Sequence, residues 1–182
     1  MPQTYALTVG KLTRQLPIIP ISDELAIASF VLLGDAELTD YAAQALATKL
    51  PADFDYLVTM ESKGIPLAQE LSRVTNHSQF VVLRKSQKDY MRSPLSVPVS
   101  AITTSAPQRL VLDGDDAQRL AGHRVVIVDD VISSGGSLEA AQALMAKVNA
   151  QVVGQVAVLA EGAAAFRTDI QFLAPLPLFP RA

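Results

Sequence analysis

Short apolar runs alternate along this chain with segments in which apolar side chains recur every three or four positions. The runs predict strands at residues 56–60, 80–83, 125–128, 156–160 and 170–173. The recurring positions predict helices at 38–46, at 65–74 with Pro66 in the first turn, and at 138–148. Run 125–128 is apolar throughout, which is typical of a strand buried on both faces of a parallel sheet. Strands that alternate with helices predict an α/β fold with a parallel sheet flanked by helices.

Two adjacent carboxylates, Asp129 and Asp130, come directly after the apolar run 125–128. In open α/β sheets, ligands bind where strands end at the carboxyl edge. A Gly-Gly turn after a buried strand is common and marks a ligand site only weakly. The acid pair adds to it, because two neighbouring like charges raise each other's pKa unless a cation or hydroxyl donors compensate. Small residues follow, whose backbone NH groups and hydroxyls suit an anion before a helix N-terminus: Ser133, Ser134, Gly135, Gly136 and Ser137.

The whole run 125–137, VVIVDDVISSGGS, resembles the motif with which type I phosphoribosyltransferases bind 5-phosphoribosyl 1-pyrophosphate (PRPP). The resemblance implies that Asp129 and Asp130 hold the ribose hydroxyls. It also implies a loop for the 5′-phosphate, made of Val131, Ile132, Ser133, Ser134, Gly135, Gly136 and Ser137. Neither a GxxxxGK[ST] P-loop nor an early GxGxxG dinucleotide motif competes with this interpretation.

A second candidate anion site follows strand 56–60. Glu61, Ser62, Lys63 and Gly64 form a turn in which glycine permits close backbone approach and lysine supplies charge. An ordinary strand-to-helix connection with a solvated lysine is the alternative. The resemblance makes this turn the pyrophosphate loop and implies a non-proline cis peptide bond, which we expect at Ser62-Lys63.

Three cations follow strand 80–83: Arg84, Lys85 and Lys88. Such clusters are often only solvated, but at a ligand edge they can neutralise pyrophosphate. Related purine enzymes carry an Arg-Lys pair here. The resemblance therefore places all three in the pyrophosphate site. It implies that catalysis depends on Asp129, Asp130, Lys63, Arg84 and Lys85.

The segment 86–110 is rich in Ser, Thr and Pro and is long for a connection inside one domain. Such segments are usually lids or binding loops, although a passive surface hairpin is an alternative. The resemblance implies a flexible lid that closes over PRPP and excludes water. Adenine enzymes supply a glutamate from this lid, whereas residues 90–111 contain no Asp or Glu.

The ends of the chain are expected to form a hood over the base, from residues 1–35 and 161–182 of a single domain that spans 1–182. The stretch 16–21, which contains two prolines, is apolar and expected to be irregular, and it suits either a hood or a core plug. We predict that Ile19, Glu161 and Phe166 contact the base, with Phe166 stacking on it or packing in the core. His77 and His123 precede strands and are expected to be solvated.

Composition limits the remaining possibilities. The chain has 182 residues, 49% of them hydrophobic, a net charge of −3 and no cysteine. The lack of cysteine excludes disulfides and thiolate chemistry, and the net charge gives no electrostatic reason to expect nucleic acid as a main partner. With no signal peptide or membrane span in view, we expect a cytoplasmic protein that acts on small molecules, with neither nucleic acid nor membrane as a partner. The resemblance suggests a homodimer, and Mg²⁺ carried by PRPP with no dedicated cage, touching at most Asp129 and Asp130.

The predicted activity is transfer of ribose phosphate from PRPP to a purine base, as in purine salvage. Adenine is favoured slightly, because Gly135, Gly136 and Ser137 resemble adenine enzymes. Xanthine and hypoxanthine or guanine remain alternatives, since Ile65 is closer to the xanthine type and the lid lacks an acid. A PRPP-sensing regulatory domain without turnover is the alternative of another class, disfavoured by the absence of a basic DNA-binding stripe.

Overall fold

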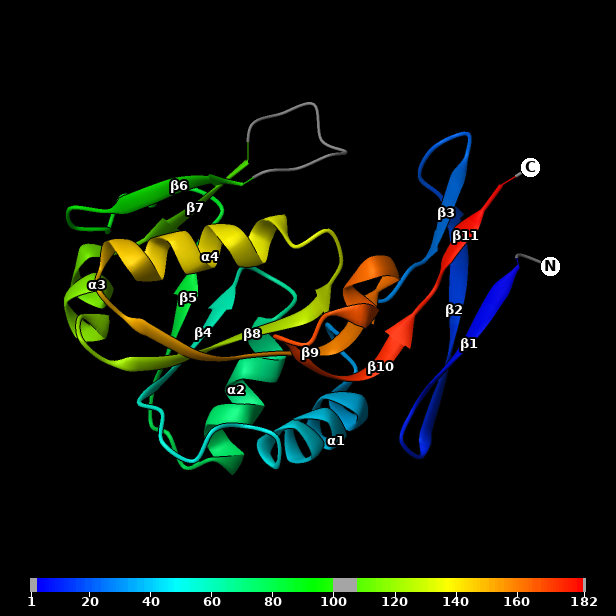
Figure 1. The fold of residues 1–182 in the computed structure, drawn as a ribbon, viewed down its shortest axis with the longest axis horizontal. Coiled ribbons are helices and arrows are strands. Elements are labelled where there is room, and N and C mark those ends of the chain that lie inside the picture. The colour runs from blue at the N-terminus through cyan, green and yellow to red at the C-terminus, as the bar shows by residue number, and fades with distance from the viewer. Residues whose placement is uncertain (1–2, 100–107, 182) are drawn as a thin grey trace.

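A five-stranded parallel sheet forms the centre of the computed structural model, which describes residues 3–99 and 108–181 (Figure 1). The strand order is β10-β9-β8-β4-β5, and every neighbouring pair is parallel. The strands are β4 (Tyr56–Met60), β5 (Phe80–Leu83), β8 (Arg124–Ile132), β9 (Gln151–Glu161) and β10 (Gln171–Leu176). The predicted α/β class is confirmed.

Helices cover both faces of this sheet. In Figure 1, α1 (Ala36–Ala47) and α2 (Ile65–Val74) lie on one face, and α4 (Gly136–Lys147) lies on the other. Successive side chains of β8 point to opposite faces of the sheet. Val126 and Val128 pack in the core beneath α1 and α2, and Val125 and Ile127 pack in the core beneath α4. The bounds of α2 match the prediction, and those of α1 and α4 differ from it by one or two residues.

Strand β8 is longer than predicted. Its ladder with β4 ends at Val128, but it pairs with β9 as far as Ile132. The expectation that the strand ends before Asp129 is therefore wrong, because hydrogen bonding to β9 keeps residues 129–132 in the strand. Asp129 and Asp130 therefore lie on the part of β8 that still pairs with β9 but no longer pairs with β4.

The two chain ends meet in an antiparallel sheet at one end of the molecule (Figure 1). Its order is β1-β2-β3-β11, with β1 (Thr4–Val9), β2 (Leu12–Pro20), β3 (Leu25–Ala28) and β11 (Leu178–Pro180). The expected irregular stretch 16–21 is mostly strand. Pro17 and Pro20 are tolerated because each half of β2 pairs on one side only, residues 12–17 with β1 and 18–20 with β3.

The C-terminal segment is divided between the two sheets. Strand β10 pairs with β9 in the parallel sheet. The short 3₁₀ helix η1 (Gly162–Phe166) connects β9 toward β10, and only β11 joins the antiparallel sheet. The expectation that all of 161–182 belongs to the hood is therefore corrected. The antiparallel sheet contains residues 4–28 and 178–180.

Part of the predicted lid forms a β-hairpin. Strands β6 (Leu95–Val99) and β7 (Gln108–Leu112) are antiparallel, and α3 (Gly114–Leu120), which was not predicted, follows them. The hairpin packs over α4, where Lys147 Nζ donates to the Ser96 carbonyl at 3.2 Å. The polar cluster 100–105 of the predicted lid lies outside the described residues.

His77 is not solvated as expected. It is half-buried and stacks on Phe54 with ring centroids 4.2 Å apart, and its Nε2 lies 3.1 Å from the Phe54 carbonyl oxygen. His123 is exposed, with its ring edge-on to Tyr56. Within 3–99 and 108–181, no helix is long and apolar enough to cross a membrane.

Candidate functional site

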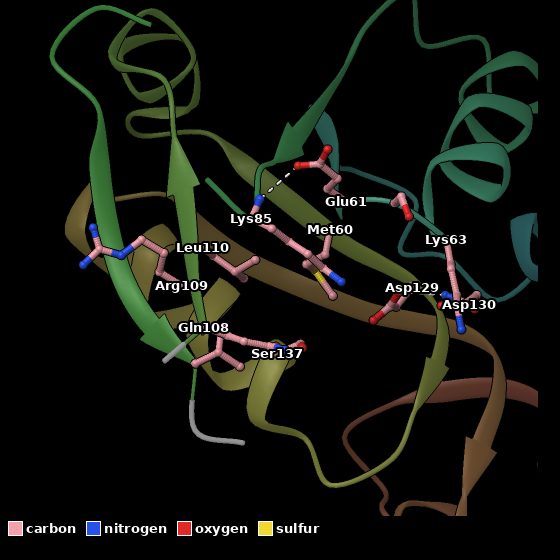
Figure 2. Close-up of a pocket in the computed structure, with 12 residues that line it drawn as sticks. Met60, Glu61, Lys63, Lys85, Gln108, Arg109, Leu110, Asp129, Asp130 and Ser137 are labelled. Atoms are coloured by element: carbon pink, nitrogen blue, oxygen red, sulfur yellow. Dashed lines mark hydrogen bonds between the residues drawn. The ribbon is translucent and has the colours of Figure 1, made fainter. Parts of the chain in front are cut away.

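A cavity of about 210 Å³ opens at the carboxyl edge of the parallel sheet, between the ends of β4 and β8 and the hairpin (Figure 2). Four parts of the chain meet here: the ends of β4, β5 and β8 with the residues that follow them, as the parallel topology requires, and the hairpin. The cavity is lined by Met60, Glu61, Ser62, Lys63, Lys85, Val99, Gln108, Arg109, Leu110, Asp129, Asp130 and Ser137. Seven of these twelve residues were predicted from the sequence as site residues.

The acid pair is the most strongly perturbed part of this cavity. Burial, and then the charge of Asp130, raise the pKa of Asp129 well above its usual range. Burial also raises the pKa of Asp130, against the opposing charge of Lys63. The Asp130 NH donates to Asp129 Oδ1 at 2.9 Å, but the buried Asp130 Oδ2 has no hydrogen-bond partner among the described residues. The pair is therefore suited to receive hydroxyl donors or a cation.

Beside the acid pair, a second hollow of about 50 Å³ lies in the loop that leads into α4. Val131 and Ile132 of the predicted phosphate loop belong to β8, so the loop itself is short. Gly135 adopts a left-handed conformation at φ 89° and is the N-cap of α4. Among the described residues no side chain caps this helix, so its first NH groups are available there for an anion of phosphate size.

The predicted pyrophosphate turn lies against Asp129. A Cβ on Gly64 would overlap Thr59 Oγ1 and lie 3.1 Å from Asp129 Oδ1, so only glycine fits. The cis peptide bond is at Glu61-Ser62, one bond before the predicted position. The position differs because the sheet ladder ends with the Glu61 NH, which donates to the Leu83 carbonyl at 2.8 Å, and the turn starts there.

Glu61 links this turn to the cation cluster. Its Oε2 accepts from the Lys85 NH at 3.0 Å (Figure 2). The same oxygen accepts from Arg84 Nε at 3.1 Å. These contacts hold the pKa of Glu61 below its usual value, with the Lys85 NH as the largest cause. Lys85 lines the cavity, and its charge opposes the rise in the Asp129 pKa.

The rest of the cation cluster lies outside the cavity lining. Arg84 is paired with Glu61, and Lys88 Nζ donates to Ser86 Oγ at 2.7 Å. Lys63 lies beside Asp130 in Figure 2. Burial raises the pKa of Glu161, and the charge of Lys63 partly opposes this rise. The structure thus brings Lys63 and Lys85 to the acid pair from two different loops.

The three predicted base contacts are not gathered in this cavity. Glu161 ends β9 and is half-buried, whereas Phe166 at the end of η1 is 87% exposed. Ile19 is 44% exposed and pairs with Ile27, which in turn pairs with Leu178 of β11. A Cβ on Gly162 would lie 2.8 Å from Leu178. One register row of the antiparallel sheet therefore connects Ile19 to the end of β9.

The sequence predicted a lid at 86–110 but did not identify which of its residues line the cavity. Val99, Gln108, Arg109 and Leu110 were not predicted, and neither was Met60. Figure 2 shows Gln108 directed toward Ser137 and the Arg109 guanidinium directed away from the acid pair. The available signal was the short apolar run at 110–112, which is consistent with a buried strand.

A family model for the phosphoribosyl transferase domain matches residues 33–173. The chain is 34% identical over 145 residues to a hypoxanthine/guanine phosphoribosyltransferase of Methanococcus voltae, covering 80% of this chain and 70% of the relative. A protein of the same name from Methanocella arvoryzae is 31% identical, covering 80% and 69%. The fold is similar to adenine phosphoribosyltransferase from Thermoanaerobacter pseudethanolicus, with TM-score 0.69, 21% identity and coverage of 88% and 95%.

Proposed function

The chain belongs to the phosphoribosyl transferase domain family, and we propose that it is a PRPP-dependent purine phosphoribosyltransferase. It would convert a purine base and PRPP to a nucleoside 5′-monophosphate and pyrophosphate. The observation that carries this proposal is the acid pair, with Asp130 buried and Asp129 half-buried, which shares one sheet edge with a phosphate-sized loop hollow and two lysines. The purine class rests on the names of relatives at 31–34% identity.

In the proposed reaction, a ring nitrogen of the base forms a bond to the anomeric carbon while the bond to pyrophosphate breaks, and the proton of that nitrogen is released. Positive charge develops on the ribose ring, and negative charge grows on the leaving oxygen. Asp129 and Asp130 accept hydrogen bonds from the two ribose hydroxyls and stabilise the adjacent positive charge. The α4 N-terminus holds the 5′-phosphate, so the sugar is fixed at both ends.

The leaving pyrophosphate meets Lys63 and Lys85, which line the cavity from two turns. Glu61 positions Lys85 through the backbone hydrogen bond at 3.0 Å. Arg84 acts through Glu61, since it pairs with that carboxylate at 3.1 Å. The proposed role of Arg84 is therefore positioning, and Lys88 supplies only charge at a distance.

The residues present fit a Mg²⁺ ion that arrives with PRPP. No group of three or more His, Cys, Asp or Glu side chains that could hold a metal occurs within the described ranges. The unpartnered Asp130 Oδ2, with Asp129 beside it, could complete the shell of an ion held mainly by phosphate oxygens. When bound, Mg²⁺ neutralises charge on the pyrophosphate.

For the base, we favour hypoxanthine or guanine. The relatives that are more than 30% identical carry that name, whereas the adenine enzymes are similar in fold at 21% identity. Adenine remains the second candidate because residues 135–137 resemble the adenine motif. The absence of acids from residues 90–111 supports the first choice over the second.

The experiment is incubation with PRPP, Mg²⁺ and, in turn, hypoxanthine, guanine, xanthine, adenine, uracil and orotate, with pyrophosphate release as the measurement. Release with hypoxanthine or guanine is expected. Release with uracil or orotate alone would overturn the purine assignment. PRPP binding without release for any base would overturn the enzyme in favour of a PRPP-sensing domain.

A further inference from the structure

Arg167, which follows η1, lies beside the phosphate loop although the site described above does not include it. A Cβ on Gly135 would lie 3.0 Å from Arg167 Nη1, so the guanidinium approaches the backbone of the α4 N-cap. The same point is 3.9 Å from Glu139 Oε1 in the first turn of α4. Arg167 does not line the loop hollow, whose walls come from residues 129–138.

Asp169 fixes the orientation of this guanidinium. Arg167 Nε and Nη2 donate to its two carboxylate oxygens at 2.9 and 2.6 Å. Two parallel hydrogen bonds of this kind hold the plane of the group. Nη1, the nitrogen nearest Gly135, has no recorded hydrogen bond within the part of the chain that the structure describes.

A buried amide anchors Asp169 in turn. Gln155 of β9 is only 8% exposed, and its Nε2 donates to the Asp169 carbonyl at 3.2 Å. Gln142 of α4 donates to Gln155 Oε1 at 2.7 Å. The chain of contacts therefore starts on α4, passes through β9 and Asp169, and returns through Arg167 to the N-terminus of α4. Such a closed network limits how far Gly135 and Arg167 can move apart.

The position of this charge is unusual for a helix. The N-terminus of a helix carries partial positive charge, which disfavours a neighbouring cation. Glu139 and Asp169 offset part of this effect. A phosphate dianion at the loop would turn the same arrangement from unfavourable to favourable, because it brings negative charge between two positive groups.

Resting on the proposed function, we infer that Arg167 is a positioning residue for the 5′-phosphate: held by Asp169, it supports Gly135 and adds positive charge behind the phosphate loop. Loss of Arg167 should therefore weaken binding of ligands that carry a 5′-phosphate and of no others. Ribose 5-phosphate carries that group, and pyrophosphate does not. Binding of these two ligands therefore separates a role at the loop from a general effect on the fold.

The test is calorimetric titration of wild type, Arg167→Gln and Asp169→Asn with ribose 5-phosphate and, separately, with pyrophosphate and Mg²⁺. For Arg167→Gln, we expect the ribose 5-phosphate Kd to rise about tenfold, as for loss of one charge-assisted interaction. The pyrophosphate Kd should stay within about twofold. Asp169→Asn keeps the cation but loosens it, so its ribose 5-phosphate Kd should rise less, about threefold. In turnover, Arg167→Gln should raise the KM for PRPP while kcat changes little.

The matched control is Arg119→Gln, which removes an arginine paired with Asp116 on α3. Its affinity for both ligands should equal that of wild type. Unchanged ribose 5-phosphate affinity in Arg167→Gln would overturn the inference, and so would a parallel loss of both ligands, which indicates a general structural effect. Failure of wild type to bind PRPP or ribose 5-phosphate would overturn the proposed function, and the inference with it.

Discussion

At the scale of single residues, Asp129 and Asp130 place charge in a buried corner that the protein alone does not neutralise. Both pKa values are raised. Between the usual aspartate pKa, about 3.9, and these raised values, the folded state binds more protons than the unfolded state. Because of this difference, the stability of the ligand-free protein falls as pH rises through that window. Ligand affinity requires the charged pair and should change in the opposite direction.

We expect the double substitution Asp129→Asn and Asp130→Asn to abolish PRPP-dependent activity and to raise Tm at pH 7. A gain of 1 kcal/mol corresponds to about 2–4 °C for a chain of this length. The gain should shrink toward pH 4, where the wild-type acids become protonated. Thermal unfolding at both pH values measures the effect, with Asp53→Asn, whose side chain is 85% exposed, as the control. A double variant that is less stable than wild type at pH 7 would contradict this electrostatic account.

Gly64 is the second decisive residue, because its missing side chain lets the pyrophosphate turn contact Asp129. We expect Gly64→Ala to lower kcat/KM about 10- to 100-fold, since the new Cβ displaces the turn or the acid. Thr59→Ala removes the nearest obstructing atom, Oγ1, which has no recorded hydrogen-bond partner in the described residues. The double variant should recover part of the rate. Wild-type kinetics for Gly64→Ala alone would show that the close approach is not required.

At the scale of secondary-structure elements, Glu61 connects the ends of β4 and β5. Its carboxylate accepts hydrogen bonds from both Arg84 and the Lys85 backbone. Its pKa is lowered, so its stabilising contribution is present above the usual glutamate pKa, about 4.3, and is lost as pH falls through the lowered value. Glu61 thus links the ends of the two parallel strands through these hydrogen bonds, which fix where Lys85 enters the cavity.

Glu61→Gln should reduce the free energy of unfolding by about 1–2 kcal/mol at pH 7, because the amide cannot replace both charge-assisted acceptors. The difference from wild type should narrow below about pH 4. Urea unfolding across this pH range is the measurement, and Glu24→Gln, at an exposed residue just before β3, is the control. Equal destabilisation at pH 7 and at pH 3 would mean that packing, and not charge, explains the effect.

At the scale of the whole molecule, Arg14 joins the antiparallel sheet to the α/β body. From β2, its Nε and Nη2 donate to Asp35 at 2.6 and 3.0 Å, and Nη2 also donates to Glu37 at 2.8 Å. Asp35 is at the same time the N-cap of α1, accepting from the Leu38 NH at 3.1 Å. Beneath this contact, Leu7 and Leu16 share the core cluster of α1.

Comparing Asp35→Ala with Asp35→Asn separates the two roles of this carboxylate. Asparagine keeps the N-cap and removes the charge, so it should cost about 1 kcal/mol of stability, and alanine about 2–3 kcal/mol. Hydrogen exchange should show residues 4–28 opening more readily than the parallel sheet in both variants. Glu37→Gln, at a residue 70% exposed, is the control and should change stability by less than about 0.5 kcal/mol. Uniform loss of protection across both sheets would contradict a joining role for Arg14.

The local pattern of the sequence determined the parallel sheet, its flanking helices, the turn glycine and the cations at strand ends, and the position of the two acids directly after an apolar run. These features depend on periodicity and on residues a few positions apart, so they can be derived without long-range contacts. Tertiary structure decided the rest. Pairing with β9 extended β8 through Asp130, one-sided pairing made a strand from a segment with two prolines, and the hairpin supplied one wall of the cavity. The tertiary structure also turned Arg84 toward Glu61 and brought Arg167 to Gly135. These contacts join residues more than 20 positions apart, and no local sequence pattern specifies where such side chains point.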